Sequence, residues 1–223
     1  MTTSTLIKSD RDIQEAVQEE LAWTPDVDDA GIGVAVENGV VTLSGEVDDA
    51  AERIAAGKAA FRTSGVTTVV EDIVIHPSSY VWTVTETDIA KNVQTAIRWV
   101  ATLPDSVTAT VEKHTVTLKG QVEWNYQREE ARRAVEAVKG VVFVVNEIIL
   151  RSRPSVANTE DRIRKALVRN ATIDANQVHV AVSGNTATLT GQVRSYVERK
   201  QAETAAWASP HVTHVNNDIS ITL

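Results

Sequence analysis

The chain has 223 residues, of which 43% are hydrophobic and 23% are charged, as in folded globular proteins rather than disordered segments. This length is enough for two or three small domains. There is no cysteine, which excludes disulfides, thiolate metal sites and cysteine nucleophiles. The formal net charge of -8 argues against nucleic acid, or an anionic membrane, as a partner of the whole surface.

The acidic residues are concentrated near the start of the chain. With cuts after residues 76 and 151, the thirds contain 5, 9 and 8 lysines and arginines against 15, 9 and 6 acidic residues, which gives net charges of -10, 0 and +2. The first residues lack the basic and apolar regions of a secretion signal, and no stretch reaches the roughly 18 apolar residues of a membrane span. We therefore expect a cytoplasmic protein that contacts a membrane only peripherally.

The first 75 residues contain the signals of five elements. Apolar residues at every fourth position of 13–21 predict an amphipathic helix. Two short strands follow, joined by Asn38-Gly39, the strongest two-residue hairpin signal. An alanine-rich segment over 48–64 predicts a second helix, and a valine-rich run over 66–75 predicts a third strand.

This pattern occurs three times along the chain. The segment Val-Thr-Leu-Ser-Gly-Glu-Val over 41–47 recurs, with small changes, over 116–122 and 187–193. Its central glycines, which we expect to serve the fold, are Gly45, Gly120 and Gly191. We therefore predict three domains, over residues 10–76, 86–151 and 158–223.

Each predicted domain is an α+β unit with the order α-β-β-α-β, a small three-stranded mixed sheet and two helices packed on one face. The hairpin strands should be antiparallel, and the strand-helix-strand half should form a parallel crossover. A unit of about 65 residues is marginal alone, so we expect the repeats to pack on one another. Three large apolar residues in the linker 76–82 predict firm docking of the first two repeats, whereas 151–155 is typical of an exposed connection.

The three repeats resemble the BON domain, a bacterial module. The resemblance rests on the hairpin pattern over 34–47, the alanine-rich helix, and a valine-rich strand with Glu71, Asn146 or Asn217 near its middle. It implies non-catalytic modules associated with phospholipid at the cell envelope, with osmotic stress, and in some proteins with potassium or with chaperone-like protection. We therefore expect a stress-linked binding protein that is not an enzyme and has no cofactor.

Two surfaces are candidates for ligand or partner contacts. A candidate aromatic surface consists of Tyr80, Trp82, Trp124 and Tyr126. A candidate basic face consists of Arg128, Arg132, Arg133, Arg162, Arg164, Lys165 and Arg169, although mixed charges on helices also describe an ordinary solvated face. Trp23 and Trp99 stand at equivalent positions of two repeats, which favours a packing role in a core or an interface.

Metal binding has little support in the sequence. The acidic loop over 26–31, together with Glu37, matches four positions of a calcium-binding loop, but Glu37 falls on a predicted strand, so we interpret the segment as an exposed acidic loop. His211 and His214 enter a strand, where a spacing of three puts them on opposite faces. We expect no metal site.

Three functional hypotheses follow from these observations. The first is peripheral binding to anionic phospholipid through repeats two and three. The second is a soluble binder of a small ion or metabolite, such as potassium. The third is a self-associating or chaperone-like scaffold, which uses its acidic first domain and basic third domain to contact another copy or a protein partner.

Overall fold

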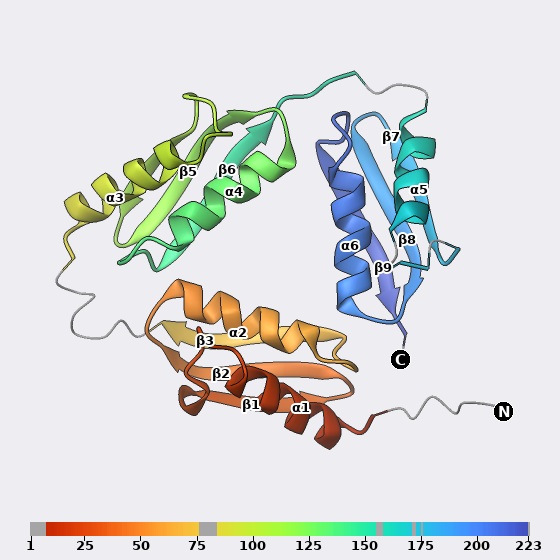
Figure 1. Ribbon diagram of the computed structural model, residues 1–223, viewed down its shortest axis with the longest axis horizontal. Helices are drawn as coiled ribbons and strands as arrows, with labels where there is room; N and C mark the ends of the chain where they lie inside the picture. The colour runs from red at the N-terminus through yellow and green to blue at the C-terminus, as the bar shows by residue number, and fades with distance from the viewer. Residues whose placement is uncertain (1–7, 76–83, 155–157, 171–172, 175, 223) are drawn as a thin grey trace.

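The computed structural model describes residues 8–75, 84–154, 158–170, 173–174 and 176–222, and it contains three repeats (Figure 1). Repeat 1 contains α1 (Asp10–Ala22), a short 3-10 turn η1 (Asp29–Gly31), β1 (Ile32–Glu37), β2 (Val40–Val47), α2 (Ala50–Arg62) and β3 (Thr68–Ile75). Repeat 2 contains α3 (Glu86–Trp99), β4 (Thr108–Glu112), β5 (Thr115–Val122), α4 (Asn125–Glu136) and β6 (Phe143–Leu150). Repeat 3 contains α5 (Thr159–Arg169), β7 (Val178–Ser183), β8 (Thr186–Val193), α6 (Tyr196–Trp207) and β9 (His214–Ile221).

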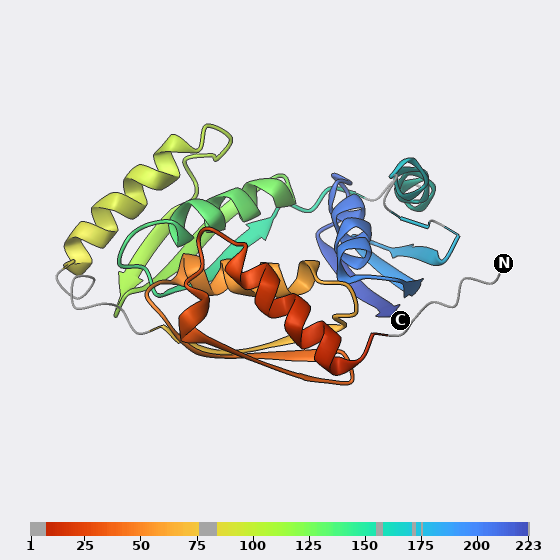
Figure 2. The same ribbon diagram turned by 60° about the horizontal axis from the view of Figure 1, so that its bottom comes forward.

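Each repeat has its own three-stranded mixed sheet. The strand that carries the repeated seven-residue motif lies in the middle, and the sheet orders are β1-β2-β3, β4-β5-β6 and β7-β8-β9. In every sheet the first pair is antiparallel and the second pair is parallel. Figure 2 shows α1 and α2 on one face of the first sheet, which confirms the predicted α+β architecture.

The core of each repeat lies between its sheet and its two helices. In repeat 1, the stripe of α1 contributes Ile13, Val17 and Leu21, and β2 contributes Val41 and Leu43, and all five side chains are at most 1% exposed. Strand residues alternate between faces, so the valine and leucine of the Val-Thr-Leu motif point towards the helices while its threonine points to the outer face. The motif is therefore a core sequence, repeated because the same core is built three times.

The motif glycine occupies a position that a side chain cannot share. Gly191 has a φ of +125°, and a Cβ built on it would collide with the backbone carbonyl oxygen of Gln177, in the loop before β7. Gly45 and Gly120 have the same backbone conformation, and Cβ atoms there would collide with the carbonyl oxygens of Gly31 and Ser106. In every repeat, the segment before the first strand crosses the central strand at the motif glycine.

We predict that Gly191→Ala destabilises repeat 3 by about 3 kcal/mol or more, because it adds both backbone strain and a steric clash. Gly184, in the β7–β8 turn, is the matched control, since it has a φ of +57° and open space around a built Cβ. Asn38 occupies the same turn position in repeat 1, so Gly184→Asn should cost about 1 kcal/mol or less. Urea denaturation measures both values, and equal losses would contradict this account.

The second helices of the three repeats face a common centre (Figure 1). Phe61, near the end of α2, stacks on Tyr196 at the start of α6, with ring centroids 3.6 Å apart and an angle of 19°. The guanidinium of Arg128, near the start of α4, lies 5.0 Å from the ring centroid of Trp207 at the end of α6. These contacts join repeat 3 to both of its neighbours.

The third junction joins repeats 1 and 2. The guanidinium of Arg53, near the start of α2, lies 5.6 Å from the ring of Phe143, which follows α4 at the start of β6. The start of each second helix thus meets the end of another second helix, or the strand that follows it. Head-to-tail contacts form a closed ring when the rotation between units brings the last unit back to the first, and here three repeats form such a ring.

The described part of the linker between repeats 2 and 3 is mostly exposed, as the sequence suggests, but its half-buried Arg153 makes specific contacts. Arg153 forms an ion pair with Glu123, and its guanidinium lies 5.5 Å from the ring of Trp124. Its backbone carbonyl accepts a hydrogen bond from Asn185 Nδ2 at 2.5 Å. The linker therefore takes part in the junction, because its arginine has both an acidic and an aromatic partner within reach. The linker 76–82 lies outside the described residues.

We predict a measurable coupling across the junction between repeats 1 and 3. A double-mutant cycle of Phe61→Ala and Tyr196→Ala should give an interaction energy of roughly 0.5–1.5 kcal/mol in urea denaturation, because the rings stack directly. Phe143→Ala combined with Tyr196→Ala serves as the control, since these residues belong to different junctions and their effects should add. An additive Phe61–Tyr196 cycle would show that this contact does not hold the ring closed.

Candidate functional site

A groove lies between α4 of repeat 2 and α6 of repeat 3, with a volume of about 690 Å³. We call it the α4–α6 groove. The residues that matter for its chemistry are Trp124, Tyr126, Arg128 and Arg133 from repeat 2, and Lys200 and Trp207 from repeat 3. The structure therefore brings together part of the candidate aromatic surface and part of the candidate basic face.

The start of α4 places the aromatic residues at the groove. Gln127 Oε1 accepts hydrogen bonds from the backbone N–H groups of Glu123 and Trp124, both at 3.0 Å, and these bonds cap the helix. Trp124 is half-buried, and its ring centroid lies 6.4 Å from that of Tyr126, which is 50% exposed. Tyr126 and Arg133 are seven residues apart, and residues at this spacing lie on one face of a helix.

The acidic side chains of the groove are engaged by neighbours. Glu129 pairs with Arg132 at 3.0 Å, and Glu203 pairs with Lys200 at 3.2 Å. Glu130 accepts a hydrogen bond from the Thr102 hydroxyl at 2.5 Å. Arg133, in contrast, is exposed and has no ion pair within 4.0 Å in the described part of the chain. The groove therefore presents the unpaired Arg133 cation beside aromatic rings, together with the Glu130 carboxylate, whose hydrogen-bond partner is a neutral hydroxyl.

Arg128 adds a polar atom without a partner to the same groove. Its Nε is buried and has no hydrogen-bond acceptor among the described residues, while its guanidinium lies over Trp207. Arg53 and Arg199 stand at the same position in the other repeats, and their Nε atoms share this property. Buried polar atoms usually have a partner, but this nitrogen is closed to solvent and its counterparts in the other repeats share the property, so it is a feature of the shared framework and does not mark a ligand site.

Arg132 belongs to the helix surface rather than to the groove. It donates hydrogen bonds to Glu129 at 3.0 Å and to Glu136 at 2.6 Å. Burial opposes its charge, but these hydrogen bonds and the two carboxylates outweigh that effect and raise the pKa of Arg132 above its usual value. Its charge is therefore neutralised within α4.

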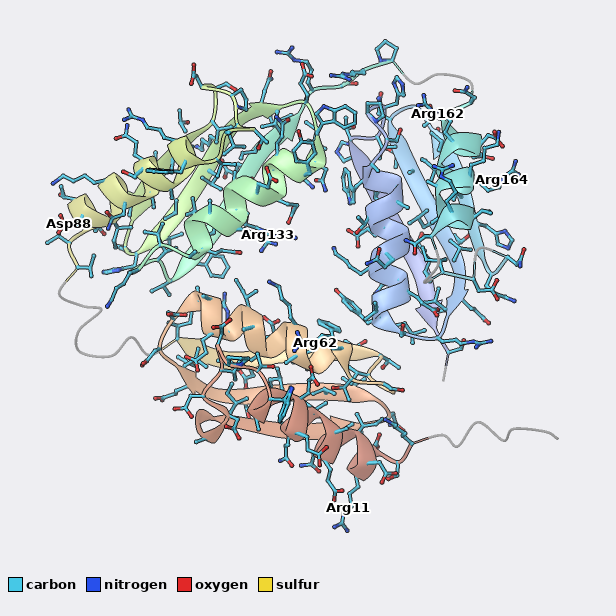
Figure 3. The ribbon with its side chains drawn as sticks, viewed as in Figure 1. Arg11, Arg62, Asp88, Arg133, Arg162 and Arg164 are labelled. Atoms are coloured by element: carbon cyan, nitrogen blue, oxygen red, sulfur yellow. The ribbon has the colours of Figure 1, made fainter. Side chains whose placement is uncertain are left out.

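The remaining members of the candidate basic face lie on another element. Figure 3 shows Arg133 on the side of α4 towards the centre of the molecule, whereas Arg162 and Arg164 lie on α5, on the outer side of repeat 3. Lys165 and Arg169 also belong to α5, and all four α5 residues are exposed. The structure does not join the α4 and α5 residues into one face.

Part of the α5 charge is neutralised locally. Asp161 accepts hydrogen bonds from Lys165 at 2.7 Å and from Arg164 at 2.6 Å, and these bonds lower the pKa of its carboxyl below the ordinary value of 3.8. Near neutral pH the carboxylate is fully ionised and balances one of the two cations. This local pairing leaves α5 less basic than its sequence suggests.

We predict that Lys165→Met raises the pKa of Asp161 towards its ordinary value, because the largest of the two lowering hydrogen bonds is lost. Lys200→Met is the control, since Lys200 pairs with Glu203 instead. Because the folded-state pKa is lowered, the pairing stabilises the protein above the unfolded-state pKa, and this effect is lost as pH falls through the folded-state value. Carboxyl NMR titration measures the shift, and an unchanged Asp161 would contradict the assignment.

Trp23 and Trp99 are 85% and 84% exposed, so they do not belong to a core of the described structure. Trp23 follows Leu21 by two residues, which is a rotation of about 200° around a helix and points the indole away from the buried stripe. In repeat 3 the equivalent residue, Ile173, lies beyond the end of α5 and is buried, at 8% exposure. The equivalence of the two tryptophans reflects a shared exposed position.

Two members of the candidate aromatic surface, Tyr80 and Trp82, lie outside the described residues. The sequence reasoning did not include Trp207 and Lys200 in the site. Trp207 occupies the position of Phe61, which also lies at a junction, but repeat 2 has Glu136 there, so alignment of the repeats gives no consistent signal. No signal marks Lys200 either.

The acidic loop has a structural explanation that does not involve calcium. Asp28 caps η1 by accepting from the backbone N–H of Ala30, and Glu52 accepts from the backbone N–H groups of Asp28 and Asp48. Glu37 ends β1, at the other end of the strand from this loop. Within the described ranges, no group of three or more histidine, aspartate or glutamate side chains is arranged to hold a metal ion.

Comparison with known families identifies the repeats. The family model for the BON domain matches residues 9–77, 85–152 and 155–222, so the chain belongs to the BON domain family, with three tandem copies. A search of curated proteins finds no match. In the described parts of the chain, no helix combines the length and apolar character needed to cross a membrane.

The similar solved structures are distant. The C-terminal domain of CdsD, a structural protein of the Type III secretion system of Chlamydia trachomatis, is 12% identical, with 100% of each chain covered and a TM-score of 0.27. A second CdsD structure is 14% identical, covering 95% of this chain and 92% of that chain, also with a TM-score of 0.27. Similarity at this level supports no inference about this chain.

Proposed function

We propose that this protein is a non-catalytic, stress-linked binding protein and that the α4–α6 groove takes an amphiphilic, anionic ligand. An anionic phospholipid headgroup is the first candidate. The observation that carries the proposal is the position of the unpaired Arg133 cation beside three aromatic side chains. An anionic ligand would supply the counter-charge that Arg133 lacks.

The chemistry of the groove suits the boundary between lipid and water. Arginine recognises phosphate through directed, charge-assisted hydrogen bonds. Tryptophan and tyrosine have apolar bodies and polar tips, and they are enriched where hydrocarbon meets headgroups. The thirds of the chain that form the groove carry net charges of 0 and +2, so its surroundings repel an anion far less than the first third, with -10, would.

The exposed tryptophans support a peripheral contact of the same kind. Trp99 is 84% exposed and follows Arg98, which is also exposed, at the end of α3. An indole beside a cation is the pairing that anchors interfacial segments to lipid. Trp23 offers a second indole in repeat 1, with acidic neighbours, so we expect its contribution to an anionic surface to be smaller.

A soluble small molecule is the second candidate. The groove volume of about 690 Å³ falls within the range of about 300–1,000 Å³ that is typical of small-molecule sites. The same aromatic and cationic side chains would bind a free organic anion. Binding to a dissolved anion such as inorganic phosphate, measured by thermal shift, would favour this candidate over a lipid surface.

We expect the protein to float at low salt with vesicles that contain equal amounts of phosphatidylcholine and phosphatidylglycerol, and not with phosphatidylcholine alone. Arg133→Ser should weaken vesicle binding about fivefold, since one basic residue near an anionic surface is worth about 1 kcal/mol. Arg169→Ser removes the same charge from α5 and is the matched control. Flotation with increasing salt should decline, because exposed charge contacts are screened.

Two results would contradict the lipid proposal. One is no retention on the anionic vesicles at low salt. The other is an equal loss for Arg133→Ser and Arg169→Ser, which would show that only overall charge matters and not the groove. Light scattering of the same samples separates vesicle binding from salt-sensitive self-association, the alternative that the uneven charge of the chain suggests.

A further inference from the structure

A second groove lies in repeat 2, between α3 and β4, with a volume of about 750 Å³. We call it the α3–β4 groove. Its apolar wall includes Ala90, Val93 and Ile97 from α3 and Ala109 and Val111 from β4. It lies on the first helix and first strand of the repeat, away from the α4–α6 groove, and Arg98 is the only residue of its lining that the proposed function uses.

The equivalent place in repeat 1 is closed by a side chain. Gln14 of α1 reaches across to β1, and its Nε2 donates a hydrogen bond to the backbone carbonyl of Val34 at 2.8 Å. In repeat 2 the equivalent residues are Ala90 and Ala109, which are both smaller. Alanine at both positions removes the bridge and part of the apolar filling, so the helix and the strand edge are separated by a groove.

The strand at this groove has a free edge. Among the described residues β4 pairs only with β5, and the register places Glu112 opposite Thr115 and Thr110 opposite Thr117. In a two-residue hairpin, the residue pair that flanks the turn is hydrogen-bonded, and hydrogen-bonded pairs alternate with non-hydrogen-bonded pairs along the strands. Ala109 and Val111 belong to non-hydrogen-bonded pairs, so their peptide groups point away from β5. The bond from Gln14 to Val34, the equivalent of Ala109, shows this outward direction in repeat 1.

We propose that the α3–β4 groove binds an extended segment of a partner protein, which adds to the sheet along β4 and places apolar side chains against α3. Main-chain hydrogen bonds to a strand edge supply affinity in this mode, and alternate side chains in a neighbouring groove supply specificity. Ala109 and Val111 offer the peptide groups, and the small residues of both elements leave room for the apolar side chains.

The charges at the rim indicate an acidic flank on that segment. Lys91 and Arg98 line the groove on the α3 side, against one acid, Asp105. Lys91 has only a long, exposed pair with Asp88, at 3.9 Å, which is a weak contact. A segment with alternating apolar residues and acidic ends therefore complements both the wall and the rim.

A second copy of the chain does not fit the groove through the same strand. The side chains of its β4 that could fill an apolar groove, Ala109 and Val111, already face its own α3. Its outward side chains are Thr108, Thr110 and Glu112, which are exposed and polar. A β4-to-β4 pair would therefore leave both grooves empty, which favours a segment with a sequence different from β4.

The test uses the full chain and an array of synthetic eight-residue peptides, with valine, leucine, isoleucine or phenylalanine at alternate positions, threonine between them and aspartate or glutamate at the ends. Ala90→Gln installs the bridging residue of repeat 1 on an exposed helix position, where glutamine is a good helix former. We expect the peptides that bind the native chain to bind Ala90→Gln at least about tenfold more weakly, because the new side chain closes the groove. Asn92→Gln, about 200° around α3 from Ala90, is the matched control and should bind like the native chain.

Amide hydrogen exchange of the native chain with its best peptide provides the second readout. Exchange at Ala109 and Val111 should slow, because their N–H groups gain acceptors, whereas exchange at Thr110 should not change, because its N–H already faces β5. Arg133→Ser should leave peptide binding unchanged, which separates this groove from the α4–α6 groove.

Three results would overturn the proposal. The first is an array in which no peptide binds the native chain better than Ala90→Gln. The second is peptide binding without slower exchange at Ala109 and Val111. The third is a concentration-dependent dimer that protects these amides with no peptide present, which would assign the edge to a second copy instead.

Discussion

A unit of two helices on a three-stranded sheet leaves the outer side of its second helix uncovered, and the rest of this structure depends on how that side is covered. The three second helices α2, α4 and α6 turn towards one centre, and each junction contains an aromatic ring: Phe61 on α2, Phe143 on β6 and Trp207 on α6. Trp207 packs against the cores of repeats 2 and 3 at once. The α4–α6 groove exists because this packing brings two helices together without filling the space between them.

Much of the fold could be predicted because its signals are local and occur three times. Apolar spacing, the hairpin residues and the motif glycine each predict an element. Because these signals occur three times, they predict the order α-β-β-α-β, which the structure confirms. The junctions could not be predicted in the same way. Equivalent positions there carry Phe61, Glu136 and Trp207, so no pattern repeats, and the contact of each residue depends on what the neighbouring repeat presents. The separation of the basic residues onto α4 and α5 likewise depends on tertiary structure that charge spacing does not encode.

The repeats also show how one framework acquires different surfaces. The acidic residue at the start of the first helix has a similar role in each copy: Asp10 and Glu86 accept hydrogen bonds from backbone N–H groups of the hairpin turn, and Glu160 accepts one from Val182, near the end of β7. Positions outside this framework vary freely. Gln14 bridges helix and strand in repeat 1, and Ala90 leaves the same place open in repeat 2. Single-residue differences on the same backbone thus decide whether a repeat closes its strand edge or leaves it exposed.

The closed arrangement of the junctions has a consequence for the architecture of the whole chain. In an open solenoid each unit touches only its neighbours in sequence, and units can be added at either end. Here repeat 3 also contacts repeat 1 through Phe61 and Tyr196, so each of the three described repeats has its second helix against another repeat. The loss of any one repeat would therefore expose two helix surfaces together.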